Sequence, residues 1–203
     1  MSLRLTLSGL AKSYPGRPVF SGINVEISSP NRLVITGPNG SGKSTMMRVI
    51  CGFIRPTKGD VKLAVNDTES SGLELRHHIG LVSPDLVLYD ELTAIENLSF
   101  FSGVSGMQFT TNELEVSLET VGLGGRGDDL AGSYSSGMKQ RLKYCLALLK
   151  KPKLLLLDEP TANLDEIGKE LVNNIIKKHD GITVIATNEK SELGYGDEII
   201  RLG

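Results

Sequence analysis

The sequence contains no tryptophan and two cysteines, and aromatic residues make up 5% of its 203 residues. Cys51 and Cys145 lie in apolar stretches and lack the close paired spacing of a zinc or redox motif. We therefore expect two buried thiols in a reducing compartment, and neither a disulfide scaffold nor a cysteine metal site.

Strong charge and long apolar runs are also missing. The formal net charge is -2, so no overall basic field favours nucleic acid or an anionic membrane surface. No stretch reaches the roughly 18 consecutive apolar residues of a membrane-spanning helix, and the N-terminus lacks a secretion-signal pattern. We expect a protein that does not bind nucleic acid and that works in the cytoplasm or on the cytoplasmic face of a membrane.

Strands and helices alternate along most of the chain. Residues 3–14 and 18–28 alternate between polar and apolar side chains around a Pro-Gly turn, which predicts antiparallel strands. The continuous apolar run at residues 153–160 is typical of a strand buried on both faces of a parallel sheet. Helical patterns follow residue 43 and residue 165. Together these patterns predict an α/β fold with a parallel sheet and crossover helices.

The middle of the chain is predominantly helical and interrupts this alternation. Thr93 and Glu96 have the spacing of a capping box at the start of a helix. We predict a single domain over residues 1–203, with an α/β core at about 1–91 and 131–203. A helical subdomain is inserted at about residues 92–130.

A glycine-rich loop between a predicted strand and a predicted helix reads GPNGSGKST and matches the P-loop pattern. Its backbone N–H groups and the helix N-terminus can bind phosphates, Lys43 can reach the β- and γ-phosphates, and the Ser44 hydroxyl can ligate Mg²⁺. The predicted nucleotide-binding residues of this loop are Gly37, Pro38, Asn39, Gly40, Ser41, Gly42, Lys43, Ser44 and Thr45. A glycine turn beside a surface lysine is the simpler alternative.

An acidic pair ends the apolar run LLLLDEP. Asp158 lies at the carboxyl end of a buried strand, which is the ligand-binding edge of an open α/β sheet. We expect Asp158 to hold Mg²⁺ and Glu159 to polarise the attacking water. Such a pair is also common at surface turns, so it indicates a nucleotide site only in combination with the P-loop.

A third polar motif, YSSGM at residues 134–138, lies between the P-loop and the acidic pair. In this order the three motifs resemble the ATP-binding cassette family over nearly the whole chain. The resemblance implies an ATP hydrolase with the P-loop core, antiparallel strands and helical subdomain of that family. It also implies that Ser135 and Gly137 bind the ATP of a second cassette in a head-to-tail dimer, although a plain helix cap at Ser135 or Ser136 describes the same local structure.

The resemblance assigns further roles. Tyr14 matches the aromatic residue that stacks on adenine. Asp165 matches a loop that couples the two sites; it is also suited to cap a helix, and the two roles are compatible. The apolar segment 86–89 falls in a region where the family receives a short helix from an integral membrane permease subunit. The chain's brevity resembles small exporter-type cassettes.

Several positions depart from the family pattern. Ser136 and Met138 replace a glycine and a glutamine in the third motif. Pro84, with Asp85 beside it, replaces a glutamine that contacts metal or water. Asn188 replaces a histidine, and its amide can donate to a γ-phosphate but does not titrate as histidine does. We expect hydrolysis to persist on Glu159.

Two alternatives to a transporter motor stay open. One is a cassette ATPase that acts on soluble partners, as in iron–sulfur cluster assembly. The other is a regulator whose departures at Pro84, Met138 and Asn188 leave nucleotide binding without turnover.

Overall fold

The computed structural model describes residues 2–66 and 68–203. The chain divides into two compact units, which are described separately. The first comprises Met1–Leu81, Pro152–Pro160 and Lys178–Gly203, and the second comprises Val82–Lys151 and Thr161–Lys177.

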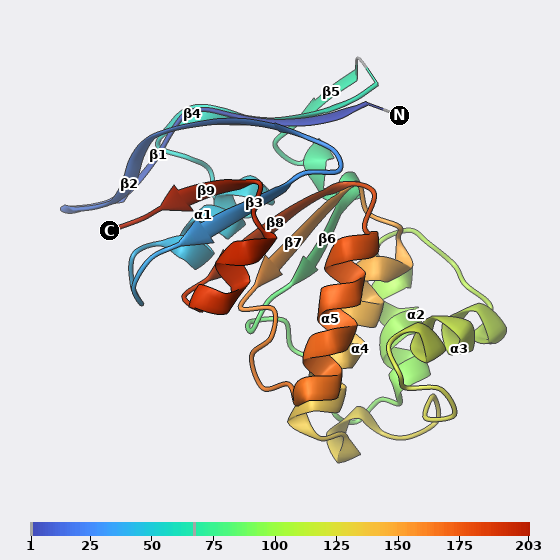
Figure 1. Ribbon diagram of the computed structural model, residues 1–203. Coiled ribbons are helices and arrows are strands. Elements are labelled where there is room, and N and C mark those ends of the chain that lie inside the picture. Colours follow the sequence, from blue (N-terminus) through green and yellow to red (C-terminus); the bar gives the residue numbers. More distant parts are fainter. Residues whose placement is uncertain (1, 67) are drawn as a thin grey trace. The chain divides into compact units, whose positions relative to one another are not determined.

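Four antiparallel strands form one sheet of the first unit (Figure 1). In sheet order they are β2 (Arg17–Ser28), β1 (Leu3–Tyr14), β4 (Lys58–Val65) and β5 (Thr68–Ser71). Leu3, Leu5 and Leu7 alternate along β1 and are all buried, as the period of two predicts for a sheet with one face on the core. The antiparallel arrangement predicted for the first strands is confirmed.

A second sheet has the order β6 (Ile79–Val82), β7 (Leu154–Asp158), β8 (Ile182–Thr187), β3 (Arg32–Thr36) and β9 (Glu198–Arg201). Strands β3, β7, β8 and β9 run parallel. Every residue of β7 and β8 is buried, so the strand buried on both faces that the continuous apolar run predicted is confirmed.

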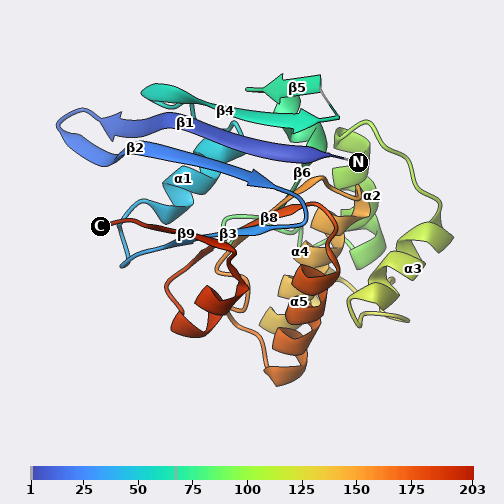
Figure 2. The same cartoon turned by 45° about the horizontal axis from the view of Figure 1, so that its top comes forward.

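Helix α1 (Lys43–Ile50) lies between the antiparallel strands and the parallel sheet (Figure 2). Its buried side chains, including Met46 and Ile50, join one core with the leucines of β1 and the apolar residues of β3, β7 and β8. The first unit also contains the short helices η1 (Glu74–His78) and η3 (Lys190–Tyr195). The loop before α1 is therefore followed by a helix that is fixed by a close-packed core.

Helices form the second unit. They are α2 (Ala94–Val104), α3 (Thr111–Thr120), η2 (Ala131–Ser133), α4 (Ser136–Leu149) and α5 (Glu166–Lys178), whose last residue falls in the first unit. The capping box predicted at Thr93 and Glu96 is confirmed, and Thr110 and Glu113 form a second one. Within the described ranges, no helix combines the length and apolarity that a bilayer crossing requires.

The predicted combination of a P-loop α/β core, antiparallel strands and added helices is confirmed. Helices α2 and α3 lie inside the range predicted for the helical subdomain. The boundary of that subdomain at residues 92–130 stays a prediction.

One buried amide organises the segment that leads into α2. Asn97 is fully buried, and its Oδ1 accepts from the backbone N–H of Tyr89 at 2.9 Å. Its Nδ2 donates to the carbonyl oxygens of Tyr89, Leu92 and Thr93 at 2.9, 3.3 and 2.9 Å. A single side chain thus satisfies the polar groups of a chain reversal that has no regular structure of its own.

We predict that Asn97→Leu destabilises the protein by about 2–4 kcal/mol, because it leaves buried peptide groups without partners. Urea unfolding followed by circular dichroism measures this change. The exposed neighbour Ser99→Ala is the control and should shift the midpoint little. Equal midpoints for both variants would contradict this role of Asn97.

Candidate functional site

The register of the parallel strands gathers three loops at one edge of the sheet. Thr36 at the end of β3 is paired with Thr187 at the end of β8. Asp158 at the end of β7 is paired with Ala186. The residues that follow, Gly37, Asn188 and Glu159, therefore emerge from the same edge of the first unit.

The P-loop is held in a conformation that only glycine adopts easily. Gly42 precedes α1 with φ at 103°, and a Cβ atom there would collide with the Val19 side chain of β2. The loop backbone thus packs directly on the β1–β2 hairpin. No side chain caps the N-terminus of α1 among the described residues, so its first N–H groups are available to an anion.

Two polar side chains of this loop, Lys43 and Ser41, point to a phosphate-binding role. Lys43 is buried, and its Nζ donates to the carbonyl oxygens of Gly37 at 2.9 Å and Pro38 at 3.3 Å. The Ser41 Oγ is buried and has no hydrogen-bond partner in the described part of the chain. A confined cation, an unsatisfied hydroxyl and a helix N-terminus fit a phosphate group.

The acidic pair Asp158 and Glu159 lies where β7 ends and the chain turns. Asp158 is 4% exposed at the end of β7. Glu159 has φ at 53°, which is unusual for a residue with a side chain. Its backbone N–H donates to the Ala186 carbonyl at 2.9 Å, so the neighbouring strand stabilises this turn.

Burial raises the pKa of the Glu159 carboxyl, and the charge of Lys43 opposes that effect. Smaller contributions that raise the pKa come from the carboxylates of Asp158, Glu192 and Glu189. A carboxylate with a raised pKa is a stronger proton acceptor than an ordinary surface glutamate. The sequence did not indicate that Glu189 and Glu192 influence Glu159, because their proximity depends on the packing of the segment after β8.

Asn188 contacts the P-loop directly. Its Nδ2 donates to the Oδ1 of Asn39 at 3.1 Å. The two amides come from loops that follow β8 and β3, so the contact depends on the strand register. The sequence predicted that Asn188 faces the phosphate site and gave no indication of this partner.

Tyr14 lies at the end of β1 and is 46% exposed. It belongs to the same hairpin as Val19, which packs on Gly42 of the P-loop. The P-loop, the acidic pair, Asn188 and Tyr14 all belong to the first unit.

Ser135 and Gly137 belong to the second unit. Ser135 caps α4, and its Oγ accepts from the N–H of Met138 at 3.2 Å. Asp165 caps α5, with its Oδ1 accepting from the N–H of Gly168 at 2.8 Å. Both predicted caps are confirmed, while binding of these residues to a second cassette stays a prediction.

The segment around Pro84 is held by lysines of α4, which sequence reasoning missed. Lys143 Nζ donates to the carbonyl oxygens of Ser83 and Pro84 at 3.3 Å each, and burial lowers the pKa of this lysine. One turn earlier, Lys139 pairs with Asp90 at 2.6 Å. Helical lysines usually point into solvent, so the sequence contained no signal for these contacts.

The described residues contain no group of three or more histidine, cysteine, aspartate or glutamate side chains that could hold a metal on its own. A hydroxyl and a carboxylate from Ser44 and Asp158 are the oxygen ligands typical of Mg²⁺ when phosphates and water complete its shell. The side chains present therefore fit a metal that arrives with its nucleotide.

Comparisons with known proteins identify the family of the chain. The family model described as "ABC transporter" matches residues 20–162. The lantibiotic transport ATP-binding protein SrtF of Streptococcus pyogenes is 34% identical over 91% of this chain and 79% of its own length. The bacitracin transport ATP-binding protein BcrA of Bacillus licheniformis is 32% identical over 95% of this chain and 64% of its own length.

Solved structures show the same fold. A putative ABC transporter ATP-binding protein from Pyrococcus furiosus superposes with a TM-score of 0.82 and 25% identity, covering 98% of this chain and 97% of its own. The dimeric cassette MJ0796 also gives a TM-score of 0.82, with 24% identity over 98% of this chain and 94% of its own. The chain belongs to the ABC transporter family and is the ATP-hydrolysing nucleotide-binding domain of that family.

Proposed function

We propose that this chain hydrolyses MgATP in a dimer of two cassettes and thereby powers a membrane permease. The observation that carries the proposal is the gathering of the P-loop, Asp158, Glu159 and Asn188 at one edge of the parallel sheet. The names of the relatives SrtF and BcrA, both transport ATP-binding proteins, support the coupling to transport.

Each side chain has a defined task in this proposal. The P-loop N–H groups and Lys43 bind the β- and γ-phosphates and stabilise the charge that develops during phosphoryl transfer. Glu159 accepts a proton from the attacking water. Ser44 and Asp158 hold Mg²⁺, which supplies further charge neutralisation on the phosphates. Asn188 donates its amide N–H to the γ-phosphate while Asn39 holds its orientation.

A second cassette completes the site. Ser135 and the Gly137 backbone, at the N-terminus of α4, form a hydrogen-bonding surface suited to a γ-phosphate. We propose that they bind the ATP held by the partner's P-loop, so that ATP closes the dimer and hydrolysis releases it. The dimeric form of the related cassette MJ0796 supports this arrangement.

The permease would bind at exposed apolar residues of the second unit. Val87 is 75% exposed, and Tyr89 and Phe100 are also exposed, with ring centroids 5.0 Å apart. Phe101 stacks on Tyr89 at 5.8 Å and extends the cluster. An aromatic surface of this kind is typical of a protein interface. It would place the chain at the cytoplasmic face of the membrane.

We predict that Glu159→Gln lowers ATP turnover at least 100-fold, because the amide cannot accept the proton. Steady-state phosphate release measures this loss. Glu198→Gln, an exposed carboxylate on β9, is the matched control and should retain turnover. Near-normal hydrolysis by Glu159→Gln would overturn its assignment as the base.

The raised pKa of Glu159 predicts the pH dependence of turnover. A general base is active when deprotonated, so kcat should fall as pH decreases through that pKa, with a midpoint above the ordinary glutamate value of about 4.3. Glu192→Gln removes one negative charge that raises the pKa, and the midpoint should move to lower pH. A midpoint that stays in place would contradict this electrostatic coupling.

We predict that Asn188→Ala lowers kcat roughly tenfold and changes KM little, because the lost hydrogen bond acts mainly in the transition state. Asn188→Asp is the isosteric comparison. It should lower kcat further, since it places a negative charge beside the negatively charged γ-phosphate. If both variants match the parent protein in kcat, Asn188 does not contact the γ-phosphate during turnover.

A further inference from the structure

A lysine covers one face of the exposed ring at the end of β1. The Nζ atom of Lys12 lies 5.0 Å from the ring centroid of Tyr14. The two residues are two positions apart at the end of β1. At this distance the ammonium interacts with the π electrons of the ring and restricts its orientation.

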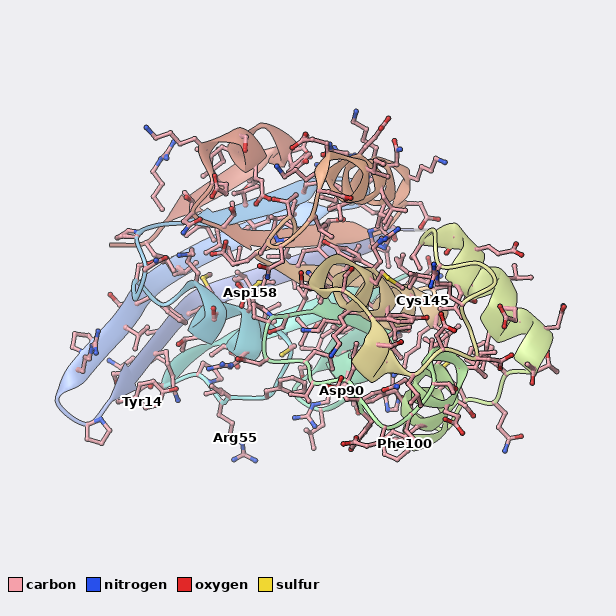
Figure 3. All side chains as sticks on the ribbon, turned by 90° about the horizontal axis from the view of Figure 1, so that it is seen from below. Tyr14, Arg55, Asp90, Phe100, Cys145 and Asp158 are labelled. Carbon is pink, nitrogen blue, oxygen red and sulfur yellow. The ribbon has the colours of Figure 1, made fainter. Side chains whose placement is uncertain are left out.

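The ammonium is itself held in place by a second segment of the chain. Lys12 Nζ donates to the carbonyl oxygen of Arg55 at 2.9 Å. Figure 3 shows Arg55 and Tyr14 on the same side of the first unit. Thr57 then fixes this segment to β1, because its backbone N–H donates to the Ala11 carbonyl at 2.8 Å and its Oγ1 accepts from the Ser13 N–H at 3.0 Å.

Tyr14 remains accessible despite these contacts. The residue is 46% exposed, and within residues 2–66 and 68–203 no other aromatic ring packs on it. An exposed aromatic ring that is held from one side presents a preformed stacking surface on the other. Val19 connects the same hairpin to Gly42 of the P-loop, so a ligand whose phosphates lie in the P-loop can extend its base toward this ring.

We propose that Lys12 is a positioning residue for the nucleotide base: it covers one face of Tyr14 and fixes the ring so that a purine stacks on the opposite face. The inference rests on the proposed nucleotide site and adds a residue that neither the P-loop nor the acidic pair contains. Lys12 improves base binding because Tyr14 loses little rotational freedom when the base arrives. Lys12 should not change the affinity for the phosphate groups.

The test separates binding of the base from binding of the phosphates. Lys12→Met keeps the length of the side chain and removes its charge. Isothermal titration should show ATP affinity about two- to fivefold lower than in the parent protein, with unchanged affinity for inorganic tripolyphosphate. Lys12→Arg should restore ATP affinity, because a guanidinium also interacts with an aromatic ring. Lys62→Met removes another lysine of the same sheet and should change neither affinity.

A spectroscopic readout follows from the absence of tryptophan. In Tyr14→Trp the introduced indole is the only one in the protein, and ATP should quench its fluorescence while tripolyphosphate should not. In the double variant with Lys12→Met, the ATP concentration that gives half of the quenching should rise by the same factor as the loss of ATP affinity in Lys12→Met alone. Unchanged ATP affinity in Lys12→Met, or an equal loss for ATP and tripolyphosphate, would overturn the inference. Failure of tripolyphosphate to bind the parent protein would instead contradict the proposed P-loop function.

Discussion

The hydrogen-bond register of three buried parallel strands is the constraint on which the nucleotide site depends. Pairing of β3 with β8 and of β8 with β7 aligns Thr36, Thr187 and Asp158 within one residue of each other. A slip of one residue would reverse the side chains of a strand and separate the loops that follow it. The apolar side chains of β7 and β8, all buried, oppose such a slip.

At this edge of the sheet, Glu159 has both a strained backbone and a partly buried carboxyl group. Glu159 has a left-handed backbone conformation and a carboxyl whose pKa is raised by desolvation, and both features cost free energy in an isolated turn. The surrounding strands and the Ala186 carbonyl stabilise them. The same edge presents the P-loop, in which Lys43 is bound to two carbonyl oxygens. Binding of phosphate would replace these internal contacts with contacts to the ligand.

Much of this arrangement could be predicted from the sequence because local patterns determine it. The run LLLLD identified a strand buried on both faces, and Thr93 with Glu96 identified a helix start. Contacts between distant segments could not be predicted in this way. Asn39 with Asn188, and Lys143 with the carbonyl oxygens of Ser83 and Pro84, depend on tertiary packing and on no local periodicity.

The most direct test of the central claim is the mass of the Glu159→Gln protein in solution, measured by light scattering after size exclusion. The account predicts a monomer without nucleotide or with MgADP and a dimer with MgATP, because unhydrolysed ATP holds two cassettes together. Ser135→Ala in the same background should weaken the dimer. A protein that binds MgATP with the expected stoichiometry and stays monomeric would contradict the composite site.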